Sequence, residues 1–510
     1  MLRSLTNPDS ARTAHHEISA LLRDYAEWLF VAEGVAQSLR RDEVDVAIVH
    51  RRIMLSCWTE KGTRLWRVLA WDWNGQSLDL EVSRKLGTEV SSIQLIPRTS
   101  AKAITATICA ARQMRCERLA QLAAALQFGS AVERMSLSRG TKPGQPGRNA
   151  QVLLKTRRER IAVTGPVVSS QPSAVDAFLS SSLLWFRRMS DRVRPPYVEQ
   201  LWLIVSLEQL KPLLYRIALL RPSLRNIIKV FTVDEELTLL SEESCPEKDE
   251  LWRKKLARFP PVAAATASDR SLAIVAEAPE AIDIVHSRHG ETLRYFGLPF
   301  ARVRSLLGRE KVWFGTNRAH RRLLDESTAN DWHNLLRDLR EHRSAAAVDH
   351  RHAFYRSAPE AWLESLLRRD ITKLDPGLII APLHAQFRTA RGAKLGIRPI
   401  DLLALRQDGR LVVIELKVSE DREHVLQGAD YWRRVEAHRR RGHIARAKLF
   451  GARTIRDEAP LVYLVAPTLR VHPAFQTLAH CISSDIEIYR FDINEDWRTG
   501  VRVMRRERVN

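Results

Sequence analysis

Two short apolar runs near the end of the sequence each contain one acidic residue that could do chemistry. Residues 400–405 read IDLLAL and residues 411–416 read LVVIEL, and Asp408-Gly409 between them is a strong signal for a hairpin turn. The sequence therefore predicts two antiparallel strands, with Asp401 in the first and Glu415 in the second. A buried carboxylate is costly unless it is paired, hydrogen-bonded or bound to a cation, so both residues need a partner.

The pairing register decides whether these two carboxylates meet. With a two-residue turn at Asp408-Gly409, Asp401 faces Leu416 and lies diagonal to Glu415. A bulge or a wider turn would supply the one-residue shift that brings the carboxylates together.

Lys417 adds a third charge at the same place. Glu415 and Lys417 are two residues apart on one strand, so their side chains point to the same face, while Leu416 points to the core. Two carboxylates and one ammonium group suit a hard divalent cation such as Mg²⁺, which prefers oxygen ligands, activates water and takes up charge on a phosphate. Lys417 would then hold the attacking water or stabilise the transition state.

The spacing of these residues resembles the signature of the PD-(D/E)XK nuclease superfamily. That signature is an acidic residue on one strand followed by (D/E)-x-K on the next, and the chain has Pro399-Ile400-Asp401 and then Glu415-Leu416-Lys417. The resemblance covers roughly residues 355–470 and says nothing directly about the rest of the chain.

Two further matches point to the RecB-like and NucS-like branches of the superfamily. Gln427 and Tyr431 match the Q-x-x-x-Y element on the next helix, where a spacing of four residues puts both side chains on one helical face. Glu364, in the stretch WLESLL, matches the glutamate on the helix before the strands.

The resemblance implies a role for each matched residue. The Leu416 carbonyl and the Asp401 and Glu415 carboxylates would bind Mg²⁺ or Mn²⁺, and Lys417 would be the catalytic base. Glu364 would complete or orient the metal shell. The residues that would position DNA are Gln427 and Tyr431.

Polar and basic side chains surround this segment and could contact phosphates. One group precedes Asp401 and the other follows Tyr431, and their members are Gln386, Arg388, Arg391, Lys394 and Arg398, then Arg433, Arg434, Arg439, Arg440 and Arg441. For the second group the alternative is a solvated basic helix end that the helix dipole partly satisfies.

The charge of the whole chain also favours a nucleic-acid partner. The formal net charge is +21, because 81 Lys and Arg outnumber 60 Asp and Glu among 510 residues. Such an excess attracts polyanions by releasing condensed counterions. A coding bias toward Arg and Ala is the alternative, although bias alone does not make acids scarce. Charge does not distinguish DNA from RNA.

Composition also limits the cellular location and the cysteine chemistry that we expect. There is no uncharged apolar run of about 18 residues and no apolar signal region at the N-terminus, so we expect no membrane partner and a cytoplasmic location. The five cysteines are scattered without a CxxC pair, which favours reduced thiols over a disulfide framework or a zinc site.

The sequence predicts an α/β, multidomain protein. We expect a β-rich N-terminal domain with flanking helices at residues 1–140, an α/β middle domain at 150–345, and a nuclease-like domain at 355–510 with a restriction-endonuclease-like mixed sheet flanked by helices. The Gly- and Pro-rich stretch 138–149 marks the first boundary. Residues 15–40 read as an amphipathic helix and residues 271–276 as a strand.

These expectations favour a metal-dependent nuclease that hydrolyses DNA phosphodiester bonds, with DNA repair or defence against foreign DNA as its setting. Two alternatives stay open: a non-catalytic nucleic-acid-binding protein that uses a nuclease fold, and a nuclease that cleaves RNA. A homo-oligomer also stays open.

Overall fold

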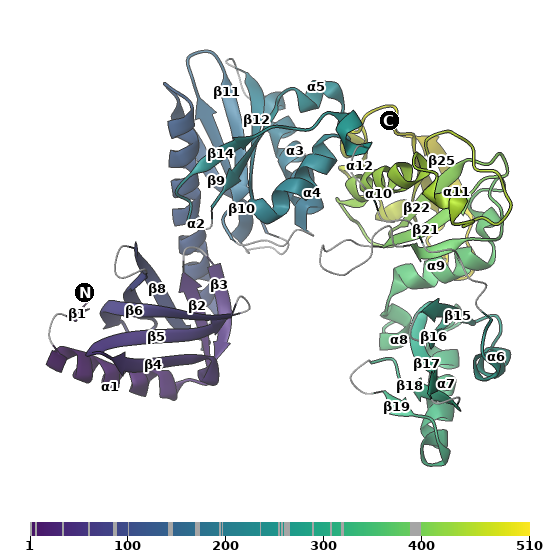
Figure 1. Cartoon of the computed structure of the whole chain (residues 1–510), viewed down its shortest axis with the longest axis horizontal. Coiled ribbons are helices and arrows are strands. Elements are labelled where there is room, and N and C mark those ends of the chain that lie inside the picture. The colour runs from purple at the N-terminus through teal and green to yellow at the C-terminus, as the bar shows by residue number, and fades with distance from the viewer. Residues whose placement is uncertain are drawn as a thin grey trace. The chain divides into compact units, whose positions relative to one another are not determined.

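The computed structural model describes the chain in two compact units, each built from mixed α/β structure (Figure 1). Unit 1 is Met1–Leu213 with Asn226–Cys245, and unit 2 is Leu214–Arg225 with Pro246–Asn510. The described residues are 3–5, 8–32, 35–59, 62–84, 89–99, 101–140, 146–168, 174–192, 195, 197–234, 236–252, 256, 259, 266–287, 290–306, 309–317, 321–387 and 399–510. They contain four sheets, two in each unit, which confirms the α/β, multidomain class.

The first sheet of unit 1 is antiparallel, with strand order β3-β2-β8-β7-β6-β5-β4 and β1 paired with β6. Helix α1 (Pro8–Asp24) packs on β4 and β5. The strands are β1 (Arg3–Ser4), β2 (Glu27–Ala32), β3 (Val35–Arg40), β4 (Val44–Val49), β5 (Arg52–Thr59), β6 (Gly62–Trp73), β7 (Leu78–Arg84) and β8 (Glu89–Pro97).

The single helix predicted for residues 15–40 is wrong in its second half. The helix ends at Asp24, and the strands β2 and β3 follow. Strand β2 is buried on both faces: Trp28 and Phe30 join the main core, whereas Leu29 and Val31 pack with Ile96 of β8. A strand buried on both sides lacks the alternation that identifies a strand in a sequence.

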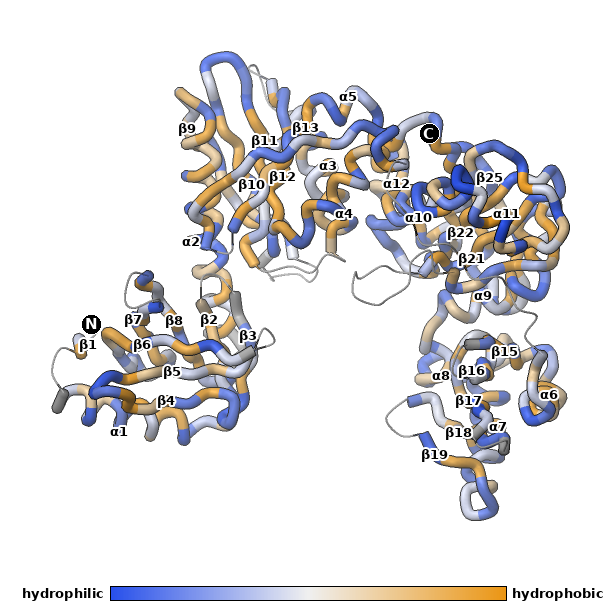
Figure 2. The backbone as a smooth tube through the Cα atoms, in the orientation of Figure 1, coloured by the Kyte–Doolittle hydropathy of each residue, from blue (hydrophilic) through white to orange (hydrophobic). Residues whose placement is uncertain are grey.

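The second sheet of unit 1 has the order β14-β13-β12-β11-β10-β9, and its β11, β12 and β13 run parallel, as strand and helix alternation predicts. Figure 2 shows apolar stretches along these strands and a hydrophilic turn between β10 and β11. The elements are α2 (Ala101–Leu126), β9 (Ala131–Arg139), β10 (Pro146–Lys155), β11 (Arg160–Pro166), α3 (Val175–Arg192), β12 (Val198–Ser206), α4 (Leu207–Ile217), β13 (Ile228–Val233) and β14 (Leu240–Glu243).

The predicted boundary at 138–149 falls inside this sheet. Strands β9 and β10 pair antiparallel across it, so the Gly- and Pro-rich stretch connects two neighbouring strands. Residues 141–145 of the stretch lie outside the described residues. Glycine and proline mark a turn equally well whether it joins two strands or two domains.

The first sheet of unit 2 is a small antiparallel one with the order β15-β16-β17-β18-β19. Its elements are α6 (Asp269–Ala276), β15 (Ile282–Ser287), β16 (Gly290–Tyr295), β17 (Leu298–Leu306), β18 (Arg309–Phe314), β19 (Arg322–Leu323) and α7 (Ala329–His342). The strand predicted for residues 271–276 is therefore wrong, since α6 covers them. The range 150–345, predicted as one middle domain, is divided between this sheet and the second sheet of unit 1, because local patterns do not show which sheet a strand joins.

The last sheet carries the candidate chemistry and is mixed, with the order β20-β21-β22-β23-β24-β25. Strands β22, β23 and β24 run parallel, and the other neighbouring pairs are antiparallel. The remaining elements of unit 2 are α5 (Pro222–Arg225), α8 (Ala353–Arg356), α9 (Pro359–Arg369), β20 (His384–Phe387), β21 (Ile400–Leu405), β22 (Leu411–Leu416), α10 (His424–Arg439), α11 (His443–Arg446), β23 (Leu461–Pro467), α12 (Phe475–Ala479), β24 (Ile488–Ile493) and β25 (Val503–Arg508).

Helices cover both faces of this sheet. Trp362 and Leu363 of α9 pack with Leu402 and Ile414 on one face, whereas Tyr431 of α10 belongs to the core on the other face. Helix α10 lies directly on β22 and β23 because Gly428 has no side chain, and a Cβ there would lie 2.6 Å from Leu464 Cδ2. In the described part of the chain, none of the helices is both long and apolar enough to cross a membrane.

A fully buried arginine joins the small sheet to α9. Arg343 donates to the carbonyl oxygens of Tyr295 at 2.8 Å, Phe296 at 2.7 Å, Phe354 at 2.6 Å and Ser357 at 2.8 Å. Arg343 thus supplies hydrogen-bond donors to carbonyl oxygens both in the corner after β16 and in the segment that leads into α9. Arg343 is therefore one of the groups that fix α9 relative to the small sheet.

We expect the substitution Arg343→Met to lower the free energy of unfolding by about 3 to 5 kcal/mol, because it leaves several buried carbonyl groups without a donor. Chemical denaturation of the whole chain would measure the loss. The matched control is Arg340→Met in the last turn of α7, directly before Arg343, which removes a half-exposed arginine and should cost less than about 1 kcal/mol. Equal losses for the two variants would contradict the role given to Arg343.

Candidate active site

The turn between β21 and β22 has three residues, one more than the sequence predicts. The Arg406 amide donates to the Arg410 carbonyl at 2.9 Å, so Gln407, Asp408 and Gly409 form the loop. Gly409 has a φ of 86°, in the left-handed region that closes such a loop. The wider turn moves the pairing register by one residue.

This register brings the two carboxylates together. Leu402 pairs with Ile414, and one further step along both strands places Asp401 opposite Glu415. Both side chains point to the face that α10 covers, because odd-numbered residues of both strands share that face with Tyr431. The one-residue mismatch of the predicted register is thus removed by the turn.

The Asp401–Glu415 pair is short of hydrogen-bond donors. Asp401 Oδ2 accepts the Leu416 amide at 2.9 Å, and Asp401 Oδ1 lies 3.5 Å from Gln386 Nε2. Glu415 is only 2% exposed, and within the described residues its buried Oε2 has no hydrogen-bond partner. Burial raises the pKa of Glu415 well above its ordinary value, and the neighbouring Asp401 charge raises it further. Burial also raises the pKa of Asp401, although the hydrogen bond from the Leu416 amide acts in the opposite direction.

Lys417 supplies the positive charge beside this pair. Its Nζ lies 2.8 Å from Glu415 Oε1 and 3.6 Å from Asp421 Oδ2. Burial favours the neutral amine, but the charge of Glu415 outweighs burial and raises the pKa of Lys417 above its usual range. An ammonium group donates hydrogen bonds and accepts no proton, so this geometry favours a charge-stabilising role over the catalytic base that the resemblance implies.

Glu364 reaches the same cluster from the opposite face of the sheet. Gln386, on the edge strand β20, donates through Nε2 to Glu364 Oε2 at 2.7 Å and faces Asp401. Arg294 of β16 holds the other oxygen, Glu364 Oε1, at 3.2 Å, and it also bonds Asp283 at 2.8 Å. Burial raises the pKa of Glu364, and Arg294 acts against that rise. Both oxygens of Glu364 are therefore engaged by protein groups.

Helix α10 brings Gln427 and Tyr431 to the carboxylate side. Gln427 is buried and donates to Glu423 Oε2 at 3.1 Å, and its Oε1 has no hydrogen-bond partner among the residues described. Burial raises the pKa of the Tyr431 hydroxyl, and the charges of Glu415 and Asp401 raise it further. Tyr431 therefore stays protonated and can donate a hydrogen bond.

Two residues that contact the site, His424 and Arg294, were not identified by the sequence analysis. His424 donates from Nε2 to the Glu415 carbonyl at 3.2 Å, and burial, followed by the Lys417 charge, lowers its pKa to about 4, so the ring is neutral. Its position at the start of α10, seven residues after Lys417, was the available signal. Arg294 carries no such signal, because it lies 70 residues before Glu364 and on another sheet.

The oxygen atoms present fit a hard divalent cation. Asp401 and Glu415 lie opposite each other, and Glu415 Oε2 is a buried acceptor that lacks a donor. The Leu416 amide points to Asp401, and its carbonyl projects to the same side, because both groups of a strand residue face one neighbouring strand. Mg²⁺ commonly binds through one or two carboxylates and keeps its waters.

Glu364 is not part of a three-carboxylate cluster in this structure. Within the described ranges, no group of three or more His, Cys, Asp and Glu side chains is placed to hold a metal ion. Arg294 and Gln386 occupy the oxygens that Glu364 would offer. The donor set is therefore two carboxylates with one carbonyl, and Glu364 instead holds the Gln386 side chain that faces Asp401.

The flanking basic residues are placed unevenly. Arg388, Arg391, Lys394 and Arg398 lie outside the described residues. Arg433 and Arg434 turn toward the buried Asp430, which Arg216 also contacts at 3.3 Å. Burial favours neutral Asp430, but these arginines outweigh it and hold the pKa of Asp430 well below its usual range. That group is part of the packing, whereas Arg439, Arg440 and Arg441 border a surface hollow.

Comparison of the chain with models of known protein families, with curated protein sequences and with solved structures gives no match.

We expect Asp401→Asn to raise the thermal unfolding midpoint in the presence of a chelator. Both carboxyls bind protons more readily in the folded protein than in the unfolded chain, so the wild type loses stability as the pH rises above the ordinary value of 4.5 for glutamate. The gain from Asp401→Asn should therefore be small at low pH and grow toward neutral pH, as thermal scans across pH would show.

The control for this prediction is Asp408→Asn in the turn. Burial raises the pKa of Asp408, but the Arg410 amide and Arg406 outweigh burial and lower it, so its charge stabilises the folded state. This second variant should lose stability at neutral pH and converge with the wild type at low pH. If Asp401→Asn also lost stability at neutral pH, the two buried carboxylate charges would not destabilise the folded protein.

Proposed function

We propose that this protein is a metal-dependent nuclease that hydrolyses phosphodiester bonds of DNA, with Mg²⁺ or Mn²⁺ as its cofactor. The observation that carries the proposal is the buried Asp401–Glu415 pair, with the unpartnered Glu415 Oε2 and Lys417 beside it. A protein that only binds nucleic acid has no physical need for buried carboxylates that repel phosphate. Buried like charges of this kind are typical of sites that hold a cation.

Each side chain has a role that its contacts support. Asp401 and Glu415 hold the cation, which when bound activates a water and takes up charge on the phosphate. Lys417 donates a hydrogen bond from its ammonium group to the phosphoryl oxygens as negative charge develops on them. Tyr431 would donate a hydrogen bond from its hydroxyl, on the side of the carboxylate pair that α10 covers. Arg294 and Glu364 together fix Gln386, which lies at the exposed rim where a strand can enter.

The substrate class follows from charge. A net charge of +21 attracts nucleic acid by counterion release, and the resemblance to the PD-(D/E)XK superfamily favours DNA over RNA. DNA repair or defence against foreign DNA is the setting that this resemblance supports. RNA cleavage is the second outcome that the test below separates.

The direct test is a cleavage assay with the purified 510-residue chain on linear, branched and single-stranded DNA and on matched RNA. We expect DNA cleavage with Mg²⁺ or Mn²⁺ and none with a chelator. Asp401→Asn, Glu415→Gln and Lys417→Met should each lower the cleavage rate by about 100-fold or more, because each removes a charge from the reacting centre.

The control is Glu487→Gln, which removes a partly buried, ion-paired glutamate on the same unit but outside the site. Its cleavage rate should stay within about threefold of the wild type. The proposal is abandoned if the wild type leaves every DNA substrate uncut with both metals while still binding DNA, because the fold would then serve binding alone. Faster cleavage of RNA than of matched DNA would mean that RNA is the substrate, while the metal-dependent hydrolysis of phosphodiester bonds would still stand.

A further inference from the structure

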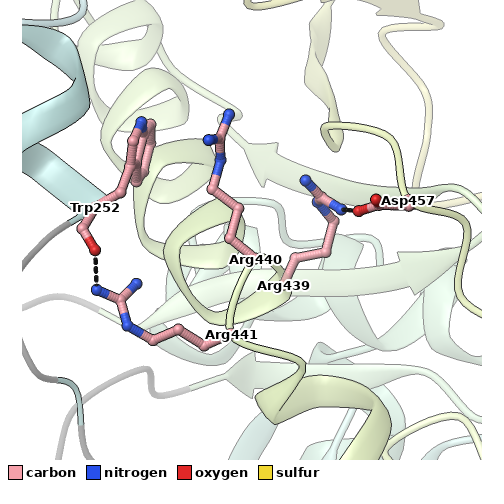
Figure 3. A pocket seen from close by; sticks show the side chains of 5 residues that line it. All are labelled: Trp252, Arg439, Arg440, Arg441 and Asp457. Atoms are coloured by element: carbon pink, nitrogen blue, oxygen red, sulfur yellow. Dashed lines mark hydrogen bonds and ion pairs between the residues drawn. The ribbon is translucent and has the colours of Figure 1, made fainter.

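A surface hollow of about 560 Å³ lies at the C-terminal end of α10, on the same helix that carries Tyr431. Its lining residues are Trp252, Arg439, Arg440, Arg441 and Asp457 (Figure 3). With the buried Glu436 beneath them, the three arginines face two carboxylates, so the local charge is positive by one. Arginine next to an aromatic ring is a common recognition device for phosphate groups of nucleic acids.

Arg440 is held in position with its fork directed outward. Its Nε donates to Glu436 Oε1 at 2.6 Å, and its guanidinium carbon lies 4.8 Å from the centre of the Trp252 ring. Figure 3 shows the side chain extended beside the indole. Among the residues described, neither Nη nitrogen of Arg440 has a recorded hydrogen-bond partner, and the side chain is 47% exposed. Two parallel donors are thus available for bidentate recognition of an anion.

The other two arginines are anchored more tightly. Arg439 donates to Glu436 Oε2 at 2.6 Å and to the exposed Asp457 carboxylate, and its side chain is 10% exposed. Arg441 donates to the carbonyl oxygens of Trp252 and Ala437. These bonds fix the walls of the hollow, and Asp457 already places one carboxylate against Arg439 where a phosphate oxygen would bind.

We propose that this hollow binds one backbone phosphate of the nucleic-acid strand, with Arg440 as the principal donor and Asp457 as a competing anion. The inference rests on the proposed nuclease function for its ligand. A helix rises about 1.5 Å per residue, so the nine residues from Tyr431 to Arg440 span roughly 14 Å. That span places the contact a few nucleotides along the strand from the reacting phosphate.

The test is a binding titration of the 510-residue chain with short fluorescent single strands of DNA and of RNA, in a chelator so that no cleavage occurs. We expect Arg440→Gln to weaken binding by roughly tenfold and to reduce the slope of log affinity against log salt by about 0.7, which is one lost phosphate contact with a single strand. Arg440→Lys should keep the slope and lose part of the affinity, because the charge remains while the fork is lost.

Asp457→Asn supplies a change of opposite sign. Removing the competing carboxylate should tighten binding by about threefold. Arg502→Gln is the matched control, because it removes an exposed arginine that is also paired with an acid, Asp496. The control should keep the salt slope of the wild type.

The outcomes separate this inference from the proposed function. If Arg440→Gln binds with the affinity and salt slope of Arg502→Gln, or if Asp457→Asn weakens binding, the hollow is not a phosphate site, whatever the cleavage assay gives. If the predicted changes appear in a protein that cuts no nucleic acid, the phosphate site stands and the nuclease function fails. Equal effects with DNA and RNA strands are expected, because a phosphate contact does not identify the sugar.

Discussion

The last sheet has to accommodate two like charges that lie opposite each other inside it. Asp401 and Glu415 have the Leu416 amide, the Gln386 side chain and the Lys417 ammonium group around them, and Glu415 Oε2 faces no donor among the described residues. A core that served stability alone would place an apolar pair here, as the rest of β21 and β22 does. The surrounding elements therefore hold the sheet together in spite of this pair.

Much of that site could be predicted from the sequence because its parts are local. The bounds of β21 and β22 match the two apolar runs, and the spacing of Glu415 and Lys417 fixes a shared face without any knowledge of the fold. The register could not be predicted in the same way, since Asp408-Gly409 signals a turn but not its length. One additional loop residue, Gln407, decides whether the carboxylates meet.

Other parts could not be predicted because they depend on distant segments. Strand β2 reads as a helix until α2 is known to cover its second face through Leu29 and Val31. Nothing in the sequence around Arg294 indicates that it is buried. In the structure Arg294 is 7% exposed and, from the small sheet, donates a hydrogen bond to Glu364. Periodicity records what one segment contributes to a core, but it does not record which partner completes that core.

The link through Arg294 gives the small sheet of unit 2 a physical connection to the carboxylate pair. Arg343 fixes the corner after β16 against the segment leading into α9, and Arg294 of β16 bonds Glu364 of α9. Arg368 of α9 bonds Asp283 of β15 as well, and Arg294 shares that carboxylate, so these contacts form one network between the small sheet and α9. A shift of the small sheet would move Arg294 away from Glu364 and release Gln386 from the side of Asp401. The geometry at the carboxylate pair is therefore set partly by residues that precede position 355 in the chain, so a chain truncated to residues 355–510 would lose the group that orients the rim of the site.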